Sequence, residues 1–128
     1  MKHPLWLAGI LFCATAPAAD IVWTNTAGGN WSAAANWSPN QVPSTNDTAW
    51  ITNNGTYTVT LNANVTLAGL NLGGTSGTQT LSQAANTLTL NGAGSGTASG
   101  VYSLAGGTLL GVGLAGVSVA LSSIVGGE

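Results

Sequence analysis

Thr56-Tyr57-Thr58-Val59-Thr60-Leu61 is the stretch of sequence that decides the fold. Threonine occupies every second position, and the apolar side chains of Tyr57, Val59 and Leu61 occupy the positions between. Strict alternation with a period of two is typical of a β-strand that buries one face, and β-branched residues favour it. We therefore predict a strand here, with its threonines on one face and its apolar side chains on the other.

The same alternation returns further along the chain, and turn-forming residues separate the repeats. Strands are expected at 70–72, 87–90, 102–104 and 108–110, with turns at Gly73-Gly74, Ser76-Gly77, Asn91-Gly92 and Gly106-Gly107. The helix formers Glu, Lys, Arg and Gln are scarce, whereas Gly and Thr are abundant. The predicted class is all-β.

The spacing of the leucines indicates how the strands stack. Leu70 and Leu88 are eighteen residues apart, as are Leu72 and Leu90. A repeat of about 20 residues is typical of a solenoid, in which each coil buries its inward face only against its neighbours. We predict a parallel β-helix. A β-sandwich or jelly roll is the alternative, because short strands at intervals of about 8 to 12 residues also fit that architecture.

Charged side chains are almost absent, and this limits the function. After residue 18 the chain has no Lys, Arg, His or Cys, and its only acidic residues are Asp20, Asp47 and Glu128. Acid–base catalysis uses a tunable His, Lys or carboxylate pair, and metal sites use His, Cys or clustered carboxylates. Nucleic-acid binding uses Lys and Arg to neutralise phosphates. We therefore expect no enzymatic activity, no metal or cofactor, and no nucleic-acid partner.

Residues 1–18 have the three-part form of a secretory signal peptide. Lys2 and His3 give a basic start, Leu5–Ala14 is apolar, and Ala16-Pro17-Ala18 offers small residues for cleavage. We predict cleavage after Ala18, with Ala16 as the alternative site, and hence an exported chain. The remaining chain of about 110 residues is long enough for one domain.

Composition divides the exported part into two segments. We predict an N-terminal cap segment at 19–51 and β-solenoid coils at 52–128. Because no polar cap follows the last coil, we expect the chain to be a truncated product. The first segment contains Pro39 and Pro43, which would block strand pairing in a connecting loop. It also holds four tryptophans: Trp23, Trp31, Trp37 and Trp50.

The cap segment resembles the opening of a known group of proteins. The run from Trp23 to Ser32, followed by Asn36-Trp37-Ser38, Val42-Pro43 and Asp47-Thr48-Ala49, is similar to the N-terminal end of bacterial autotransporter passenger domains and related pectin-lyase-like β-helix proteins. The resemblance implies a right-handed coil and a secreted or cell-surface protein. Members of the group include adhesins and secreted enzymes, so the fold alone does not fix the function.

Composition and resemblance together predict a non-catalytic structural segment of an adhesin or autotransporter-like protein, with a polysaccharide or host surface as partner. Any membrane contact is expected through a region downstream of this chain. Two alternatives stay open. One is a carbohydrate-binding module, and the other is the N-terminal piece of a polysaccharide-degrading β-helix enzyme whose active residues lie beyond position 128.

The four tryptophans are either a packed cap or a platform on which sugar rings stack. We favour the cap, because the spacing of Trp23, Trp31, Trp37 and Trp50 places no two reliably on one strand face. Asp47 is the only charged residue in the sequence around Trp31, Trp37 and Trp50, and a sugar-binding site commonly uses more than one charged side chain. We expect Asp47 to accept backbone N–H bonds in the turn after Pro43 and so to orient the strand from Thr48 to Thr52.

Two further patterns are interpreted as ordinary strand sequence. Thr58/Thr60, Thr78/Thr80 and Thr87/Thr89 are similar to the threonine arrays of ice-binding solenoids. The last two pairs lie nine residues apart, about half a coil, and are therefore expected to face different directions. Residues 109–125 carry no charge and are just long enough for a membrane helix. No Lys or Arg flanks them, and Val117–Ser122 alternates as a strand does, so we favour strands.

Overall fold

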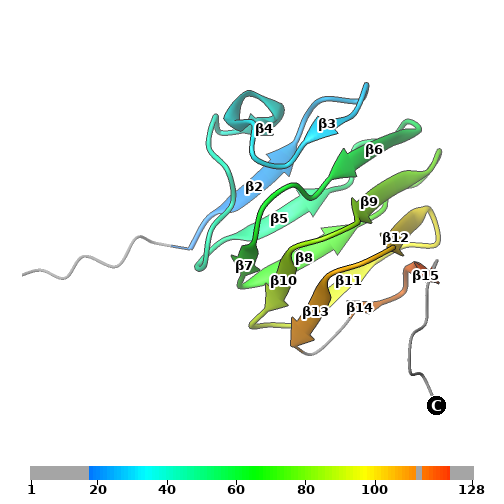
Figure 1. The fold of residues 1–128 in the computed structure, drawn as a ribbon. Helices are drawn as coiled ribbons and strands as arrows, with labels where there is room; N and C mark the ends of the chain where they lie inside the picture. Colours follow the sequence, from blue (N-terminus) through cyan, green and yellow to red (C-terminus); the bar gives the residue numbers. More distant parts are fainter. Residues whose placement is uncertain (1–17, 112–113, 122–128) are drawn as a thin grey trace, which may run out of the picture.

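The computed structural model describes residues 18–111 and 114–121, so all of the predicted leader except Ala18 lies outside the described residues. The described chain is a right-handed parallel β-helix (Figure 1). Every strand pairing is parallel except the one between β2 and β4. The predicted fold class is confirmed, and the sandwich or jelly-roll alternative is wrong, because those folds are built from antiparallel sheets.

Three sheets form the walls of the helix. The first sheet contains β2 (Asp20–Trp23), β5 (Thr48–Ile51), β8 (Gly69–Leu72), β11 (Gly94–Gly96), β14 (Leu114–Ala115) and the antiparallel β4 (Trp37–Ser38). The second sheet contains β3 (Gly29–Asn30), β6 (Tyr57–Thr60), β9 (Gln79–Gln83), β12 (Gly100–Leu104) and β15 (Ser118–Leu121). The third sheet contains β7 (Val65–Leu67), β10 (Thr87–Leu90) and β13 (Thr108–Gly111).

The chain visits the three sheets in a fixed order, and each visit to all three completes one coil. The complete coils are β5–β6–β7, β8–β9–β10 and β11–β12–β13. Strands β2 and β3 begin the first coil, but the loop at 39–47 stands where its third strand would lie. The segment Thr48–Ile51, which we assigned to the cap, is therefore the first strand of the first complete coil.

The register gives the length of a coil. Tyr57 pairs with Gln79 and Gln79 with Gly100, which are steps of 22 and 21 residues. The predicted repeat length of about 20 residues is correct. The leucine pairs from which we derived it, however, do not occupy equivalent positions in successive coils. Leu70 in β8 and Leu88 in β10 belong to different sheets of the same coil. Leucines recur within one coil because β8 and β10 each bury a leucine at every second position.

The core fills the space between the three sheets. In β6 the side chains of Tyr57 and Val59 point inward and are buried, whereas Thr58 and Thr60 are exposed, as the alternation predicts. Full burial of one such apolar side chain is worth roughly 1.5 to 3 kcal/mol. The largest hydrophobic side chains that are completely buried are Trp23, Trp31, Tyr102, Ile21, Ile51, Leu67, Leu70, Leu72, Leu81, Leu88 and Leu90.

Two buried glutamines also lie in this core, and the sequence analysis missed them. Gln79 accepts a hydrogen bond from the backbone N–H of Gly74 (2.6 Å) and donates to the carbonyl oxygens of Gly55 (2.6 Å) and Ser76 (2.9 Å). It therefore connects two successive coils from the inside.

Gln83 makes the equivalent connection one coil further on. Its side-chain amide donates to the carbonyl oxygens of Asn86 (2.9 Å) and Thr108 (3.0 Å), and its side-chain oxygen accepts a bond from the Tyr102 hydroxyl. Buried polar groups are tolerated only when they are hydrogen-bonded, and both glutamines meet this condition.

The described part of 109–125 consists of strands β13, β14 and β15, as we favoured. The only helical element among the described residues is the 3-10 turn at Ala34–Asn36, and none of the described helices is long and apolar enough to cross a membrane.

Candidate functional site

Three of the four tryptophans of the cap segment form one buried cluster. Trp23, Trp31 and Trp37 are at most 2% exposed. The rings of Trp23 and Trp37 lie 5.0 Å apart at 89°, and those of Trp31 and Trp37 lie 4.7 Å apart at 67°. Edge-to-face contacts of this kind add about 0.5 to 1.5 kcal/mol each to the burial term. The cluster closes the interior of the stack at its first coil.

The chain reverses direction to bring these rings together. The turn at Ala34–Asn36 turns the chain back, so that β4 pairs antiparallel with β2 and Trp37 stands opposite Trp23. The indole N–H of Trp37 donates to the carbonyl oxygen of Trp31 (2.8 Å), and that of Trp23 donates to the carbonyl oxygen of Asn25 (2.6 Å). Because β4 occupies the outer edge of β2, no parallel strand can pair with β2 at that end.

Trp50 stands apart from this cluster. It lies on β5 at an outward position, half-buried, and its indole N–H donates to the Asp20 carboxylate (3.0 Å). A sugar ring can stack only on an indole face that it can reach. Among the four tryptophans proposed as a stacking platform, Trp50 alone offers such a face.

Asp47 is buried at the end of the loop that leads into β5. Its carboxylate oxygen accepts hydrogen bonds from the backbone N–H (2.9 Å) and the hydroxyl (3.1 Å) of Ser44, and its own N–H donates to the Ser44 carbonyl oxygen (2.8 Å). These bonds form a closed turn immediately before the strand. Among the described residues no three His, Cys, Asp or Glu side chains lie close enough to hold a metal ion.

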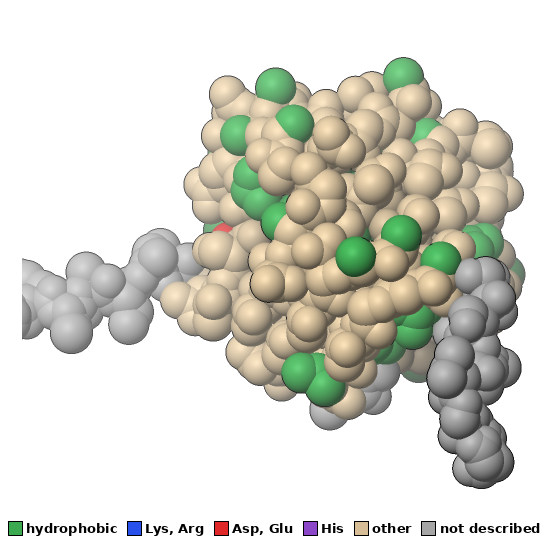
Figure 2. Space-filling view, in the orientation of Figure 1, with side chains coloured by type: hydrophobic (Ala, Val, Ile, Leu, Met, Phe, Trp, Pro, Cys, Tyr) green, Lys and Arg blue, Asp and Glu red, His purple; other side chains and the backbone are tan. Residues whose placement is uncertain are grey.

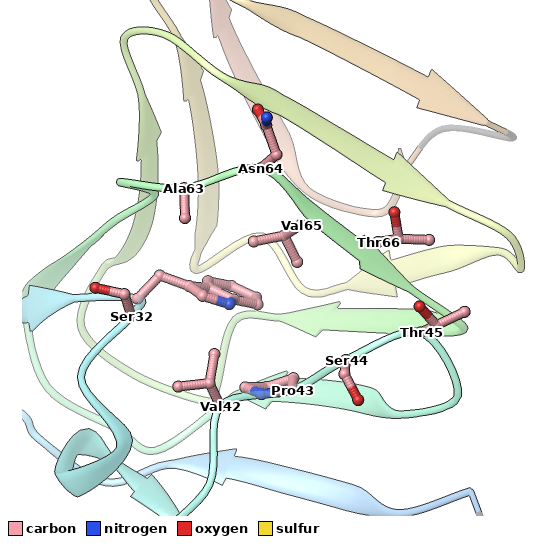
Figure 3. Close-up of a pocket in the computed structure, with 10 residues that line it drawn as sticks. Ser32, Val42, Pro43, Ser44, Thr45, Ala63, Asn64, Val65 and Thr66 are labelled. Atoms are coloured by element: carbon pink, nitrogen blue, oxygen red, sulfur yellow. The ribbon is translucent and has the colours of Figure 1, made fainter. Parts of the chain in front are cut away.

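A cavity of about 310 Å³ lies beside the tryptophan cluster. Figure 3 shows Val42, Pro43, Ser44 and Thr45 of the loop on one side of it and Ala63 to Thr66 on the other. Strand β7 ends the third sheet at this point, and the loop replaces the strand that a regular coil would place beside it. The cavity therefore results from the incomplete first coil.

The walls of this cavity are neutral. Its lining residues supply hydroxyl groups, the amide of Asn64 and apolar surface, but no titratable side chain. Trp31 also lines the cavity, and its indole N–H is the only buried side-chain polar group among the described residues without a hydrogen-bond partner. Trp31 is completely buried, so this N–H is closed off from any molecule that enters the cavity. The lining residues supply no group for proton transfer.

Among the described residues, the two groups whose pKa is clearly shifted are tyrosines that lie elsewhere in the core. Burial raises the pKa of Tyr102 to about 12, and it raises the pKa of Tyr57 as well. Tyr102 donates to Gln83, and Tyr57 donates to the carbonyl oxygen of Asn53 (2.8 Å). Their hydroxyls thus serve hydrogen bonds within the fold.

Comparisons of this chain with protein-family models, with curated protein sequences and with solved structures gave no significant match.

Proposed function

We propose that this chain is a non-catalytic structural segment of a secreted or cell-surface protein of the adhesin or autotransporter-like kind. The observation that carries the proposal is the use of the buried polar side chains. Asp47, Gln79 and Gln83 are fully engaged in hydrogen bonds that hold turns and coils together. They do not converge on the cavity, whose lining is neutral.

The surface supports the same proposal. Figure 2 shows a face built almost entirely of uncharged side chains and backbone, with very little acidic colour and no basic colour. A solenoid of stacked coils extends along one axis and presents long side walls to its surroundings. An elongated domain of this kind can present a surface to a partner and can hold the segments attached to its two ends apart. Neither role requires a reactive group.

Export is the first part of the proposal to test. The full chain and a version lacking residues 1–18 are expressed in a bacterium, and the cytoplasmic and exported fractions are compared by immunoblot. The full chain is expected outside the cytoplasm with a new N-terminus at Ala19, and the shortened version inside it. Recovery of the full chain uncleaved in the cytoplasm would contradict the proposal.

Catalysis is the second part. The purified protein is incubated with neutral and acidic polysaccharides, and new reducing ends and unsaturated products are measured. The expected result is no turnover above a buffer control. Turnover that follows the protein through two different purification steps would refute a purely structural role.

A further inference from the structure

The outward face of the second sheet carries a regular grid of hydroxyl groups. Thr58 pairs with Thr80 and Thr80 with Val101, while the neighbouring row runs from Thr60 through Ser82 to Ser103. A third row continues the register beyond the strand ends, because the N–H of Thr78 donates to the Thr56 hydroxyl (3.3 Å) and that of Gln79 to the Ser99 carbonyl oxygen (3.0 Å). The nine positions of this hydroxyl grid are Thr56, Thr58, Thr60, Thr78, Thr80, Ser82, Ser99, Val101 and Ser103.

This alignment corrects part of our interpretation of the Thr-x-Thr pairs. Thr87 and Thr89 do face away, because they lie on the third sheet. Thr58/Thr60 and Thr78/Thr80, however, meet on one sheet, because Thr58 and Thr80 are separated by one full coil of 22 residues. The second sheet thus stacks threonines in register where the sequence spacing pointed to ordinary strand propensity alone.

The geometry of the hydroxyl grid follows from the parallel sheet. Neighbouring strands lie about 4.8 Å apart and alternate residues along a strand about 6.6 Å apart, so hydroxyl groups repeat on a nearly rectangular lattice. Figure 1 shows β6, β9 and β12 lying side by side along this wall. Threonine is stiff at its first side-chain torsion, so its hydroxyl and methyl groups are held in place before any partner binds.

Most hydroxyl groups of the grid make no hydrogen bond within the described part of the protein. Among the described residues, no hydrogen bond uses the side chains of Thr58, Thr60, Thr80, Ser82 or Ser103. Polar side chains elsewhere in the solenoid connect the coils. Asn54 bonds to Thr75 (3.0 Å), for example, and Ser95 donates to Asn71 (2.7 Å). These hydroxyl groups therefore remain available to a partner.

We propose that the hydroxyl grid binds ice. The surface of ice is a rigid, uncharged lattice of water molecules that offers only hydrogen-bond donors and acceptors. The grid has matching properties, because none of its nine positions is charged and eight of them carry a hydroxyl. Each contact with a lattice water is weak. A rigid set of contacts that engage together binds far more strongly than one, because ordering is already complete before binding.

A polysaccharide is the competing partner, and the composition of the face disfavours it. Sugar rings are commonly held by an aromatic side chain stacked against their apolar side. No position of the hydroxyl grid is aromatic, and the half-exposed Trp50 lies on the first sheet. Val101 keeps the shape of threonine without its hydroxyl, so it leaves the grid flat.

The test compares two single substitutions at equivalent places on different walls. Thr80→Tyr puts a large ring at the centre of the hydroxyl grid, and Thr89→Tyr puts the same ring at the centre of the third sheet. Both positions are outward, half-buried and in the middle complete coil. The purified protein and both variants are incorporated into slowly growing ice, and the fraction in the ice phase is measured. Far-UV circular dichroism and the melting temperature confirm that each is folded.

The unaltered protein and Thr89→Tyr are expected to enter the ice equally, and Thr80→Tyr at least about tenfold less. Thr80→Val removes a hydroxyl but keeps the shape, and it is expected to lower incorporation by a smaller factor. Exclusion of the unaltered protein from ice, or equal incorporation of the two tyrosine variants, would overturn the proposal. Retention on cellulose or chitin that is lost in Thr80→Tyr, together with exclusion from ice, would assign the face to a polysaccharide instead.

Discussion

At its first coil the stack ends in three buried tryptophans and an antiparallel strand, whereas at its last described coil it ends in β13, β14 and β15. Among the described residues, each of these three strands has a ladder partner on one side only. Leu110 and Val119 lie on this second end and are about half exposed, at 50% and 52%. The comparison teaches that ladder bonds alone do not close a solenoid. Closure at the first coil needs aromatic packing and a reversed strand, since an unpaired parallel edge remains open to other strands.

The largest effect is expected from removing a closing side chain. Trp37→Ala opens a cavity in the cluster and removes both ring contacts and the bond to the Trp31 carbonyl. We expect a loss of about 3 to 5 kcal/mol in the free energy of unfolding, measured by urea denaturation. Leu110→Ala at the other end is expected to cost less than about 1 kcal/mol, because the side chain is half exposed. Equal losses at the two ends would break the comparison.

The next largest effect is expected from removing the buried glutamines. Gln79 bonds to the coil before its own and Gln83 to the coil after it, so the two substitutions compare the strength of the internal hydrogen bonds towards each end. Gln79→Leu removes the side-chain partner of Gly55, Gly74 and Ser76, and Gln83→Leu removes that of the Thr108 carbonyl and of the Tyr102 hydroxyl. Each unsatisfied group costs about 1 to 3 kcal/mol, so we expect losses of about 2 to 4 kcal/mol for each variant. Native-state hydrogen exchange then shows where each variant opens. Opening of Gln83→Leu is expected near β12 and β13, while the tryptophan cluster stays protected.

A smaller effect is expected from alkaline pH. Burial raises the pKa of Tyr102 to about 12, while in the unfolded chain the group has an ordinary tyrosine pKa of about 10. Between these values the unfolded chain has lost a proton that the folded chain still holds, so stability falls as pH rises, by about 1.4 kcal/mol per unit. Below about pH 9 this group contributes no pH dependence.

The control for this pH effect is Tyr102→Phe, which removes the titrating group. Denaturation midpoints are measured from pH 8 to 12, and the variant is expected to lose most of the decline above about pH 10. Part of the decline is expected to remain, because burial also raises the pKa of Tyr57. A profile of the variant that falls as steeply as that of the unaltered protein would show that Tyr102 does not govern the loss.

The smallest effect on stability is expected at the last described coil. Leu110→Lys and Val119→Lys place charges beside the edges of β13 and β15, and exposed changes of this kind shift stability by about 0.5 kcal/mol or less. Charged side chains on an edge strand discourage pairing with another chain. Sedimentation velocity at rising concentration is expected to show less self-association for the double variant. A lysine at outward Thr58 is the matched control and is expected to leave self-association unchanged.

Much of the fold could be predicted from the sequence because its signal is local. The alternation from Thr56 to Leu61 determines which face of β6 is buried, and the same holds for β8 and β10. Strand β11 carries no such signal, since Gly94-Ser95-Gly96 has no apolar side chain. It is a strand because β8 and β14 flank it. Glycine is required at position 96 because any side chain there would clash with the Leu72 carbonyl oxygen.

The site was harder to predict, because it depends on contacts between distant residues. The spacing of Trp23, Trp31 and Trp37 does not reveal that β4 folds back on β2. The cavity was not predicted either, since it exists only because the loop at 39–47 replaces a strand. Gln79 and Gln83 could have been found, because with Leu81 between them they share one face of β9.

Every parallel ladder among the described residues joins a strand to its counterpart one coil away in the sequence. Each coil after the incomplete first one therefore closes a loop of only about 20 residues, which keeps the entropic cost of every step small. Growth can proceed in one direction, from the tryptophan end onward, with each finished coil acting as the template for the next. A polypeptide that emerges N-terminus first can thus begin folding before its later segments have appeared.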